Sequence, residues 1–282
     1  MTRLSIITVN LNNRQGLKRT LKSVASQSYK NVELILVDGG SSDGSQELFP
    51  QYQTIITRVV SEPDRGIYHA MNKGIGMACG EYLLFLNSGD WLAENDVLER
   101  VFSDFPDTDI VAGDIDYIDP ATSRVRWHVE SPDLLTAATL FHGSLPHQAT
   151  FIRSHLFAKH GLYNEELTIA SDWKFFLEVL LEKHATYARF RGTVACFMLD
   201  GLSSRPETCG LPQQEQRFVL GQKFPRFLTD YDRLKALDDE RVQWQNSREF
   251  HAFRILKKTG VVSAMILLIR VSNRLRKIFK TK

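Results

Sequence analysis

Acidic and amide side chains follow four short apolar segments in the first ninety residues of the chain. Asn10 follows the first segment, Asp38 the second, Asp64 the third, and Asn87 and Asp90 the fourth. Amide and carboxylate groups can hold the base and ribose of a nucleotide through hydrogen bonds. Carboxylate oxygens are also ligands that Mg²⁺ and Mn²⁺ prefer. The pattern predicts a ligand site in which Asp90 holds a metal ion or a phosphate-bearing ligand.

The apolar segments that precede these residues are typical of buried strands. The clearest covers residues 82–86, and it ends at the turn formers Asn87-Ser88-Gly89. Earlier strands are expected at residues 3–9, 32–37 and 55–60, and helices at 15–27, from 45 onward and at 67–79. Alternating strands and helices predict right-handed βαβ units and a parallel sheet. Ligands of such sheets bind beyond the carboxyl ends of the strands, where these polar residues would meet.

Two common phosphate-binding motifs are absent from the chain. A dinucleotide site would need G-x-G-x-x-G after the first strand, and a P-loop would need G-x-x-x-x-G-K-[ST]. Gly74-Ile75-Gly76 is followed by Gly80, one residue too far, and lies in an expected helix. A nucleotide held by Asn and Asp side chains remains open, with its diphosphate neutralised by a divalent cation on Asp90.

The composition is that of an ordinary globular protein of 282 residues, with 43% hydrophobic and 24% charged residues. Cys79, Cys196 and Cys209 lack metal-binding spacing, which favours reduced thiols and a cytoplasmic location. The first strand begins at once, so no signal peptide is expected. No apolar run approaches the roughly 20 residues of a membrane span.

The charge of the chain is divided unevenly. The whole chain has 35 basic and 33 acidic residues, yet nine bases and no acid follow Glu249. The last segment therefore carries a charge of +9, and residues 1–249 carry 26 bases and 33 acids, or −7. A basic amphipathic helix is expected at the C-terminus, and it could lie on an anionic membrane surface at the inner face of the plasma membrane. A terminal helix packed on the domain is the alternative.

Five motifs occur in an order that resembles the family 2 glycosyltransferases of the GT-A fold. They are Thr8-Val9-Asn10 and residues 36–44, 64–74, 86–90 and 170–173. The resemblance extends from the N-terminus to about Ser204. It implies an α/β fold with a mostly parallel, Rossmann-like central sheet flanked by helices, and it implies a sugar nucleotide as the donor.

The resemblance also implies roles for residues at the strand ends. In the family, the acid after the second strand contacts the uracil or other base, which points to Asp38. The Asp-Arg-Gly region helps to hold the nucleoside, which points to Asp64 and Arg65. The full set expected to bind the nucleotide sugar is Thr8, Asn10, Asp38, Asp64, Arg65, Asn72 and Asn87.

The fourth strand end departs from the family pattern. Most members have a D-x-D motif where this chain has Asn87-Ser88-Gly89-Asp90. Asp90 is therefore the carboxylate expected to bind a divalent cation, Mn²⁺ or Mg²⁺. The branch resembled is that of bacterial surface-polysaccharide enzymes of the O-antigen type, which often have N-S-G-D at this position.

The second half of the chain is expected to serve the acceptor. Asp172 opens a predicted helix at residues 173–182, where an acid also suits the helix N-terminus. In similar enzymes an acid at this place is the general base, and we expect that role for Asp172. His147 and Gln148 precede a predicted strand, and similar enzymes have this pair near the active site. Ser203 lies in a segment that resembles the one closing over donor and acceptor.

These observations predict an inverting glycosyltransferase that moves a sugar from a nucleotide sugar, with UDP the expected nucleotide, to a hydroxyl of a glycan or lipid-linked acceptor. No nucleic acid partner is expected. A glycosyltransferase domain is expected at residues 1–205, with a nucleotide-binding half at 1–105 and an acceptor half at 106–205. Residues 206–282 are expected to be a helical C-terminal extension. The alternatives are a nucleotide-sugar-binding scaffold and a sugar-1-phosphate nucleotidyltransferase, which would need a glycine-rich loop after the first strand.

Overall fold

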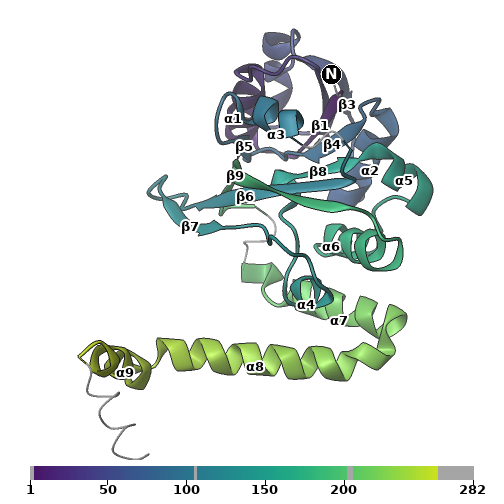
Figure 1. Ribbon diagram of the computed structural model, residues 1–282. Coiled ribbons are helices and arrows are strands. Elements are labelled where there is room, and N and C mark those ends of the chain that lie inside the picture. The colour runs from purple at the N-terminus through teal and green to yellow at the C-terminus, as the bar shows by residue number, and fades with distance from the viewer. Residues whose placement is uncertain (1–2, 105–106, 202–205, 260–282) are drawn as a thin grey trace, which may run out of the picture. The chain divides into compact units, whose positions relative to one another are not determined.

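The computed structural model describes residues 3–104, 107–201 and 206–259. Contacts divide the chain into two compact units, residues 1–224 and 225–282, which are described separately (Figure 1). Helix α7 (Leu211–Lys223) belongs to the first unit, where the carboxylate of Glu215 accepts hydrogen bonds from three successive backbone N–H groups, those of residues 168–170. The sequence predicts a domain boundary after residue 205, and this boundary stays a prediction. The two compact units defined by contacts meet after Phe224.

Four parallel strands in the order β3-β2-β1-β4 form one half of the central sheet. Their bounds are β1 (Leu4–Asn10), β2 (Val32–Asp38), β3 (Ile56–Ser61) and β4 (Tyr82–Phe85). The register places Asn10 beside Asp38, and Asp38 beside Ser61. The polar residues at these strand ends therefore lie on one edge of the sheet, as expected from the sequence.

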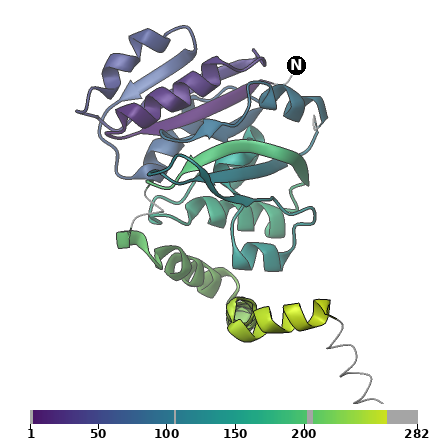
Figure 2. The same cartoon turned by 90° about the vertical axis from the view of Figure 1, so that its left-hand side faces the viewer.

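Helices cover both faces of this half of the sheet (Figures 1 and 2). α1 (Arg14–Ala25) and α3 (Val97–Asp104) share a hydrophobic cluster with Ile6 of β1. α2 (Ile67–Met77) contacts β1 and β2 and packs against Ile7, the neighbouring residue on the opposite face of β1. This double cover explains why β4 is apolar throughout and why β2 is apolar at five of its seven positions.

The helix expected from Ser45 is instead two short 3₁₀ helices, η1 (Ser45–Leu48) and η2 (Pro50–Tyr52). Pro50 has no backbone N–H and its ring clashes with the carbonyl four residues earlier, so a continuous α-helix is interrupted here. The segment still returns the chain from β2 to β3.

The other half of the sheet is mixed. Its strands are β5 (Trp91–Leu92), β6 (Ile110–Ile118), β7 (Val125–Val129), β8 (Thr150–Arg153) and β9 (Tyr187–Met198). β8 is antiparallel to both β4 and β6, while β9 is parallel to β6 and β7 pairs antiparallel with β6. β9 is a single strand of twelve residues, because it stays paired with β6 through irregularities in the register.

Short helices follow these strands. Their bounds are α4 (Ala137–His142), α5 (Ser154–His160), α6 (Ser171–Leu177) and η6 (Pro206–Thr208). The helix expected at residues 173–182 is α6 followed by a π-helical turn, η4 (Glu178–Glu182). Trp173 of α6 is buried, and its indole N–H donates to the carbonyl of Leu140 over 2.6 Å. This bond holds α6 against α4.

The second unit is helical in its described part, residues 225–259. It contains η7 (Pro225–Phe227), α8 (Leu228–Asn246) and α9 (Arg248–Lys258). The Ser247 side chain caps α9 by accepting from the N–H of Phe250. No helix in the described residues is both long and apolar enough to cross a bilayer. The basic amphipathic helix expected at the C-terminus falls mainly on residues 260–282, which lie outside the described residues.

Close packing of α2 on β1 leads to a testable difference between two glycines of the same helix. A Cβ atom on Gly74 would lie 2.4 Å from Cγ2 of Ile7, whereas one on Gly76 would meet no atom within 4 Å. We expect Gly74→Ala to lower the free energy of unfolding by about 1–3 kcal/mol through overpacking. Gly76→Ala should raise it by about 0.5–1 kcal/mol because alanine favours the helix. Urea unfolding measures both, and equal effects of the two substitutions would contradict this packing.

Candidate active site

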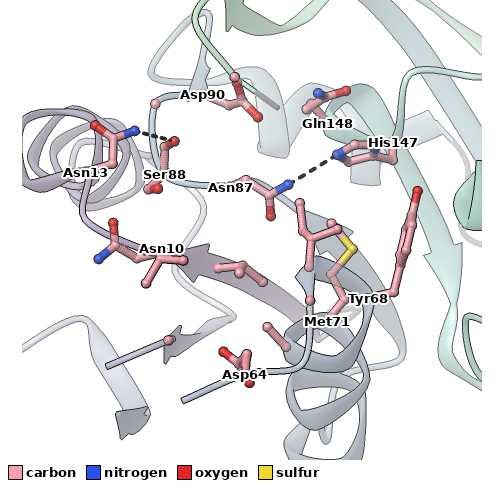
Figure 3. Close-up of a pocket in the computed structure, with 18 of the residues that line it drawn as sticks. Asn10, Asn13, Asp64, Tyr68, Met71, Asn87, Ser88, Asp90, His147 and Gln148 are labelled. Atoms are coloured by element: carbon pink, nitrogen blue, oxygen red, sulfur yellow. Dashed lines mark hydrogen bonds between the residues drawn. The ribbon is translucent and has the colours of Figure 1, made fainter. Parts of the chain in front are cut away.

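A cavity of about 610 Å³ opens at the carboxyl ends of β1 and β4 (Figure 3). The loops that follow these two strands line it, together with the start of α2, the 3₁₀ helix η3 (His147–Ala149) and the end of β9. The cavity therefore lies between the parallel half of the sheet and the mixed half. This is where an open α/β sheet binds ligands.

The turn at residues 87–90 is held in place by α1. Thr20 of α1 accepts a hydrogen bond from the N–H of Gly89 over 3.1 Å, and its hydroxyl lies 2.6 Å from the carbonyl of Asp90. Asn13 donates to the carbonyl of Ser88 over 2.9 Å. Gly89 has a φ of 111°, a conformation that L-residues other than glycine rarely adopt. Gly89 and the hydrogen bonds of Thr20 and Asn13 together fix where the Asp90 side chain enters the cavity.

Asp90 is a buried acid, with 5% of its surface exposed. Burial raises the pKa of Asp90 to about 7, and the negative charge of Asp200 adds to the rise. The charge of His147, a hydrogen bond from Gln148 and one from the N–H of Met198 oppose it. Asp200 also lines the cavity, just after β9, although no motif in the sequence pointed to it.

The residues present suit a divalent cation that keeps other ligands of its own. Asp90 and Asp200 place two carboxylates on the wall of the same cavity. Within the described residues, no group of three or more His, Cys, Asp or Glu side chains could hold a metal ion. Mg²⁺ is commonly bound through one or two carboxylates together with substrate phosphates and water. The donor set therefore fits a cation shared with a bound diphosphate, and it does not fit a site made by protein alone.

Asp172 lies in the first turn of α6 and has partners on both carboxylate oxygens. Its Oδ2 lies 2.9 Å from Nδ1 of His147, and its Oδ1 accepts from the hydroxyl of Tyr68 over 2.9 Å. The Tyr68 hydroxyl also lies within hydrogen-bond distance of the carbonyl of Ile169. Burial, followed by the charge of Asp172, raises the pKa of Tyr68 well above its ordinary value, so this hydroxyl remains a donor.

His147 and Tyr68 line the cavity, whereas Asp172 does not. The side chain of Asp172 is 13% exposed and that of His147 is 18% exposed. Figure 3 shows His147 beside Gln148, with the other ring nitrogen, Nε2, directed toward Asn87 at 3.4 Å from its Nδ2. Asp172 therefore stands one layer behind the cavity wall, in contact with two residues that form it.

Asp38 also stands behind the wall. It is fully buried, and it accepts hydrogen bonds from Asn10, Ser41 and Ser61. Burial disfavours its ionised form, but these hydrogen bonds outweigh that effect and keep the pKa of Asp38 below its ordinary value. Asn10 and Gly39 line the cavity beside it. Asp38 is thus positioned to orient Asn10 and the Gly39 loop.

Asp64 lines the cavity, and its Oδ1 forms an ion pair of 2.7 Å with Lys73. Three other residues expected at the donor site lie elsewhere. Thr8 is fully buried and donates to the carbonyl of Leu86, while Asn72 bonds to the backbone of Tyr163. Arg65 is 73% exposed in its side chain and pairs with Glu165 over 2.6 Å.

The cavity therefore gathers only part of the expected set. Among the described residues it brings together Asn10, Asp64, Asn87, Asp90, His147 and Gln148. Ser203 lies outside the described residues. Tyr68 was not anticipated as a partner of Asp172, although it follows Gly66 at the start of an expected helix beside the Asp-Arg-Gly motif. Donor binding by Thr8, Arg65 and Asn72 stays a prediction, and the observed contacts give these residues structural partners.

Comparison with known proteins identifies the family. Residues 5–169 match the family model described as Glycosyl transferase family 2. A PGL/p-HBAD biosynthesis glycosyltransferase of Mycobacterium bovis (strain BCG / Pasteur 1173P2) is 36% identical over 180 residues, which cover 61% of this chain and 67% of the relative. The chain belongs to glycosyl transferase family 2 and is a transferase, which confirms the resemblance seen in the motifs.

Solved structures confirm the predicted fold. S. aureus TarS 1–349 in complex with UDP-GlcNAc has a TM-score of 0.60 and 18% identity, covering 78% of this chain and 66% of that chain. The mannosyltransferase PcManGT from Pyrobaculum calidifontis, in complex with GDP-Man and Mn²⁺, has a TM-score of 0.56 and 12% identity, covering 94% of this chain and 86% of that one. At these identities the likeness concerns the fold, which is the α/β arrangement of the GT-A glycosyltransferases.

Proposed function

We propose that the protein is an inverting glycosyltransferase that moves a sugar from a UDP-sugar to a hydroxyl of a glycan or lipid-linked acceptor in surface polysaccharide synthesis. The observation that carries the proposal is one cavity bounded by the buried acid Asp90 and by His147, with Asp172 bound directly behind it. A pair of this kind can take a proton from the acceptor. An acid at the fourth strand end suits the diphosphate of the donor when a cation is shared between them.

The donor would occupy the part of the cavity nearest the parallel strands. Asn10, Asp64 and Asn87 offer hydrogen bonds to a nucleoside, and Asp38 holds Asn10 in place. Asp90, with Asp200 beside it, would hold Mn²⁺ or Mg²⁺, which would supply charge neutralisation for the leaving diphosphate. The ligands bound in the two structures of similar fold, UDP-GlcNAc in one and GDP-Man with Mn²⁺ in the other, support this donor class.

With donor and acceptor in these positions, the sugar would be transferred in a single displacement of the nucleoside diphosphate by the acceptor hydroxyl. The acceptor hydroxyl gives its proton to the pair formed by His147 and Asp172, and its oxygen bonds to the anomeric carbon of the sugar. The bond from that carbon to the diphosphate breaks, and the nucleoside diphosphate leaves with the electron pair. One displacement inverts the anomeric centre.

Thermal stabilisation tests the donor class first, because a ligand that binds only the folded protein raises its melting temperature. UDP with Mn²⁺ should raise it more than UDP alone or Mn²⁺ alone. UDP release should then follow from at least one UDP-sugar in a panel. Binding without release from any donor or acceptor would favour the scaffold, and release of pyrophosphate from UTP with a sugar 1-phosphate would favour the nucleotidyltransferase.

We also propose that the C-terminal segment places the enzyme on an anionic membrane. Helix α9 exposes the apolar side chains of Phe253, Ile255 and Leu256. They lie in the same stretch of the helix as the bases Arg254, Lys257 and Lys258, and between Glu249 and the end of the chain nine bases occur and no acid. Apolar residues and bases together support binding to anionic headgroups. A membrane location would bring the enzyme to a lipid-linked acceptor.

Vesicle sedimentation of the full chain tests the membrane proposal. The protein should sediment with phosphatidylglycerol vesicles, weakly with phosphatidylcholine vesicles, and less as salt is added. Reversing the charges of Lys257 and Lys258 in α9 to glutamate should lower the bound fraction. The same reversal of Arg233 and Lys235 in α8 is the matched control, and an equal loss in both variants would contradict a role for this particular segment.

A further inference from the structure

We propose that His147 is the group that accepts the proton of the attacking hydroxyl, and that Asp172 is a positioning residue acting through it. This inference rests on the proposed glycosyl transfer and deepens it. The hydroxyl proton passes to Nε2 of His147 as the hydroxyl oxygen bonds to the anomeric carbon and the diphosphate leaves with its electron pair. The imidazolium then forms an ion pair with Asp172, and it later releases the proton to solvent.

The contacts of the ring define which nitrogen carries the proton at rest. Asp172 Oδ2 lies 2.9 Å from Nδ1, and an ionised carboxylate can only accept, so Nδ1 is the N–H that donates to it. Nε2 of the neutral ring then carries the lone pair and can act as an acceptor. The neighbour of Nε2 is the amide nitrogen of Asn87 at 3.4 Å, which can only donate. Both neighbours favour the same tautomer, with the basic nitrogen on the side of the cavity.

The access of the two side chains to a substrate also differs. His147 lines the cavity, and Asp172 lies behind it with Oδ1 held by Tyr68 and Oδ2 held by His147. For Asp172 to meet an acceptor hydroxyl directly, one of these two partners would have to move aside. His147 can meet it while both contacts of Asp172 stay in place, and the hydroxyl would replace only the 3.4 Å contact between Nε2 and the Asn87 amide.

The charges around His147 suit an imidazolium formed during the reaction. Asp172 of α6 lies against the Nδ1 side of the ring, at 2.9 Å. Asp90 of the turn after β4 is near enough to interact with the charge of His147, but its carboxylate would be neutralised by the proposed cation. Tyr68 of α2 is neutral and donates to Asp172. The carboxylate of Asp172 therefore lies where it would stabilise the positive charge that the ring gains as it takes the proton. The same arrangement orients the ring through Nδ1.

The tautomer of His147 is a direct test that does not depend on knowing the substrate. Nitrogen-15 NMR of the full chain, with the signal assigned by its loss in His147→Gln, reports which ring nitrogen bears the proton. We expect the Nδ1–H form in the wild type and loss of that preference in Asp172→Asn. A wild-type ring with its proton on Nε2 overturns the proposal, whether or not any donor is turned over.

Donor hydrolysis, with water as the acceptor, tests the proton transfer itself. UDP release from UDP-glucose, UDP-galactose, UDP-GlcNAc and UDP-GalNAc is measured for the wild type and for His147→Ala. We expect His147→Ala to lower turnover about 100-fold or more with little change in donor KM, and added imidazole to restore at least tenfold. The double variant with Asp172→Asn should be no slower than the slower single variant, because the two residues act as a unit.

Two kinetic results overturn the assignment to His147. One is a folded His147→Ala variant that keeps more than a tenth of wild-type turnover, and the other is a slow variant that imidazole does not accelerate. His147→Gln is the second variant, should the alanine variant fail to fold. A wild type that releases no UDP from any donor is a failure of the proposed function instead, and the tautomer measurement then decides on His147 alone.

Discussion

Replacing Asp172 by asparagine is expected to lower turnover by about 100-fold or more while leaving UDP affinity within about twofold. The amide cannot form an ion pair with a protonated His147, and it no longer forces Nδ1 of the ring to donate. Asparagine has nearly the same shape, so the hydrogen bond from Tyr68 and the packing of α6 should remain. UDP release from the best donor of the panel measures the first effect, and calorimetry with UDP measures the second.

The control for Asp172→Asn is Asp109→Asn. Asp109 is a hydrogen-bonded acid of the same unit whose Oδ2 accepts from Thr186, and it does not line the cavity. The Asp109→Asn substitution should change turnover less than threefold. Retention of most of the turnover by Asp172→Asn would remove both the direct and the positioning role from this residue. Equal losses of turnover and UDP affinity would show instead that the cavity had been deformed.

Replacing Asp90 by asparagine should abolish the extra stabilisation that Mn²⁺ gives to the UDP complex and lower turnover by at least 100-fold. The carboxylate is the buried acid of the cavity wall, and an amide is a much weaker ligand for a hard cation. Asp200→Asn should have a smaller effect, because Asp200 is exposed and water screens its charge. Asp119→Asn, in the turn between β6 and β7, is the control. Full Mn²⁺ dependence of UDP binding in Asp90→Asn would contradict the assigned cation site.

The same substitution should change how stability depends on pH in the metal-free protein. Because the pKa of Asp90 is raised from 3.8 to about 7 in the folded state, ionisation disfavours that state. The free energy of unfolding contributed by this group is therefore highest below about pH 4, falls as pH rises to about 7 and is constant above it. The fall is at most about 4 kcal/mol, since one pKa unit corresponds to about 1.4 kcal/mol.

Urea unfolding at pH 5 and pH 8 measures this effect as a difference between proteins. Between these values the wild type should lose more stability than Asp90→Asn, which has no charge to bury. If the free energy of unfolding changes equally with pH in the two proteins, burial does not raise the pKa of Asp90. Excess Mn²⁺ with UDP should reduce the difference by stabilising the ionised form in the wild type.

Local patterns were sufficient to predict the parallel half of the sheet. The runs at residues 32–37 and 82–86 are buried strands, and both are followed by residues that favour turns. Parallel pairing then requires their carboxyl ends to share an edge, so the position of Asp90 at the cavity followed from the sequence. The helix expected from Ser45 is wrong, because Pro50 is incompatible with a helix interior and the segment forms η1 and η2 instead.

Contacts between distant segments were beyond local patterns. His147 and Asp172 are 25 residues apart, and Tyr68 and Asp172 are 104 apart, so no spacing rule could pair them. The N-terminus of α6 shows the same limit. The Oγ of Ser171, the first residue of α6, has no hydrogen-bond partner within the described chain, and Glu215 of α7 binds the N–H groups of the two residues before it.

The sequence by itself determined the alternation of strands and helices, the polar strand ends and the family, because these depend on side-chain periodicity and motif order along the chain. Only the tertiary structure decided which acids reach the cavity. Asp90 enters it, while Asp38 and Asp172 stand behind Asn10 and His147. The reason is that exposure depends on which neighbours satisfy a polar group once the layers have packed, and those neighbours come from other elements.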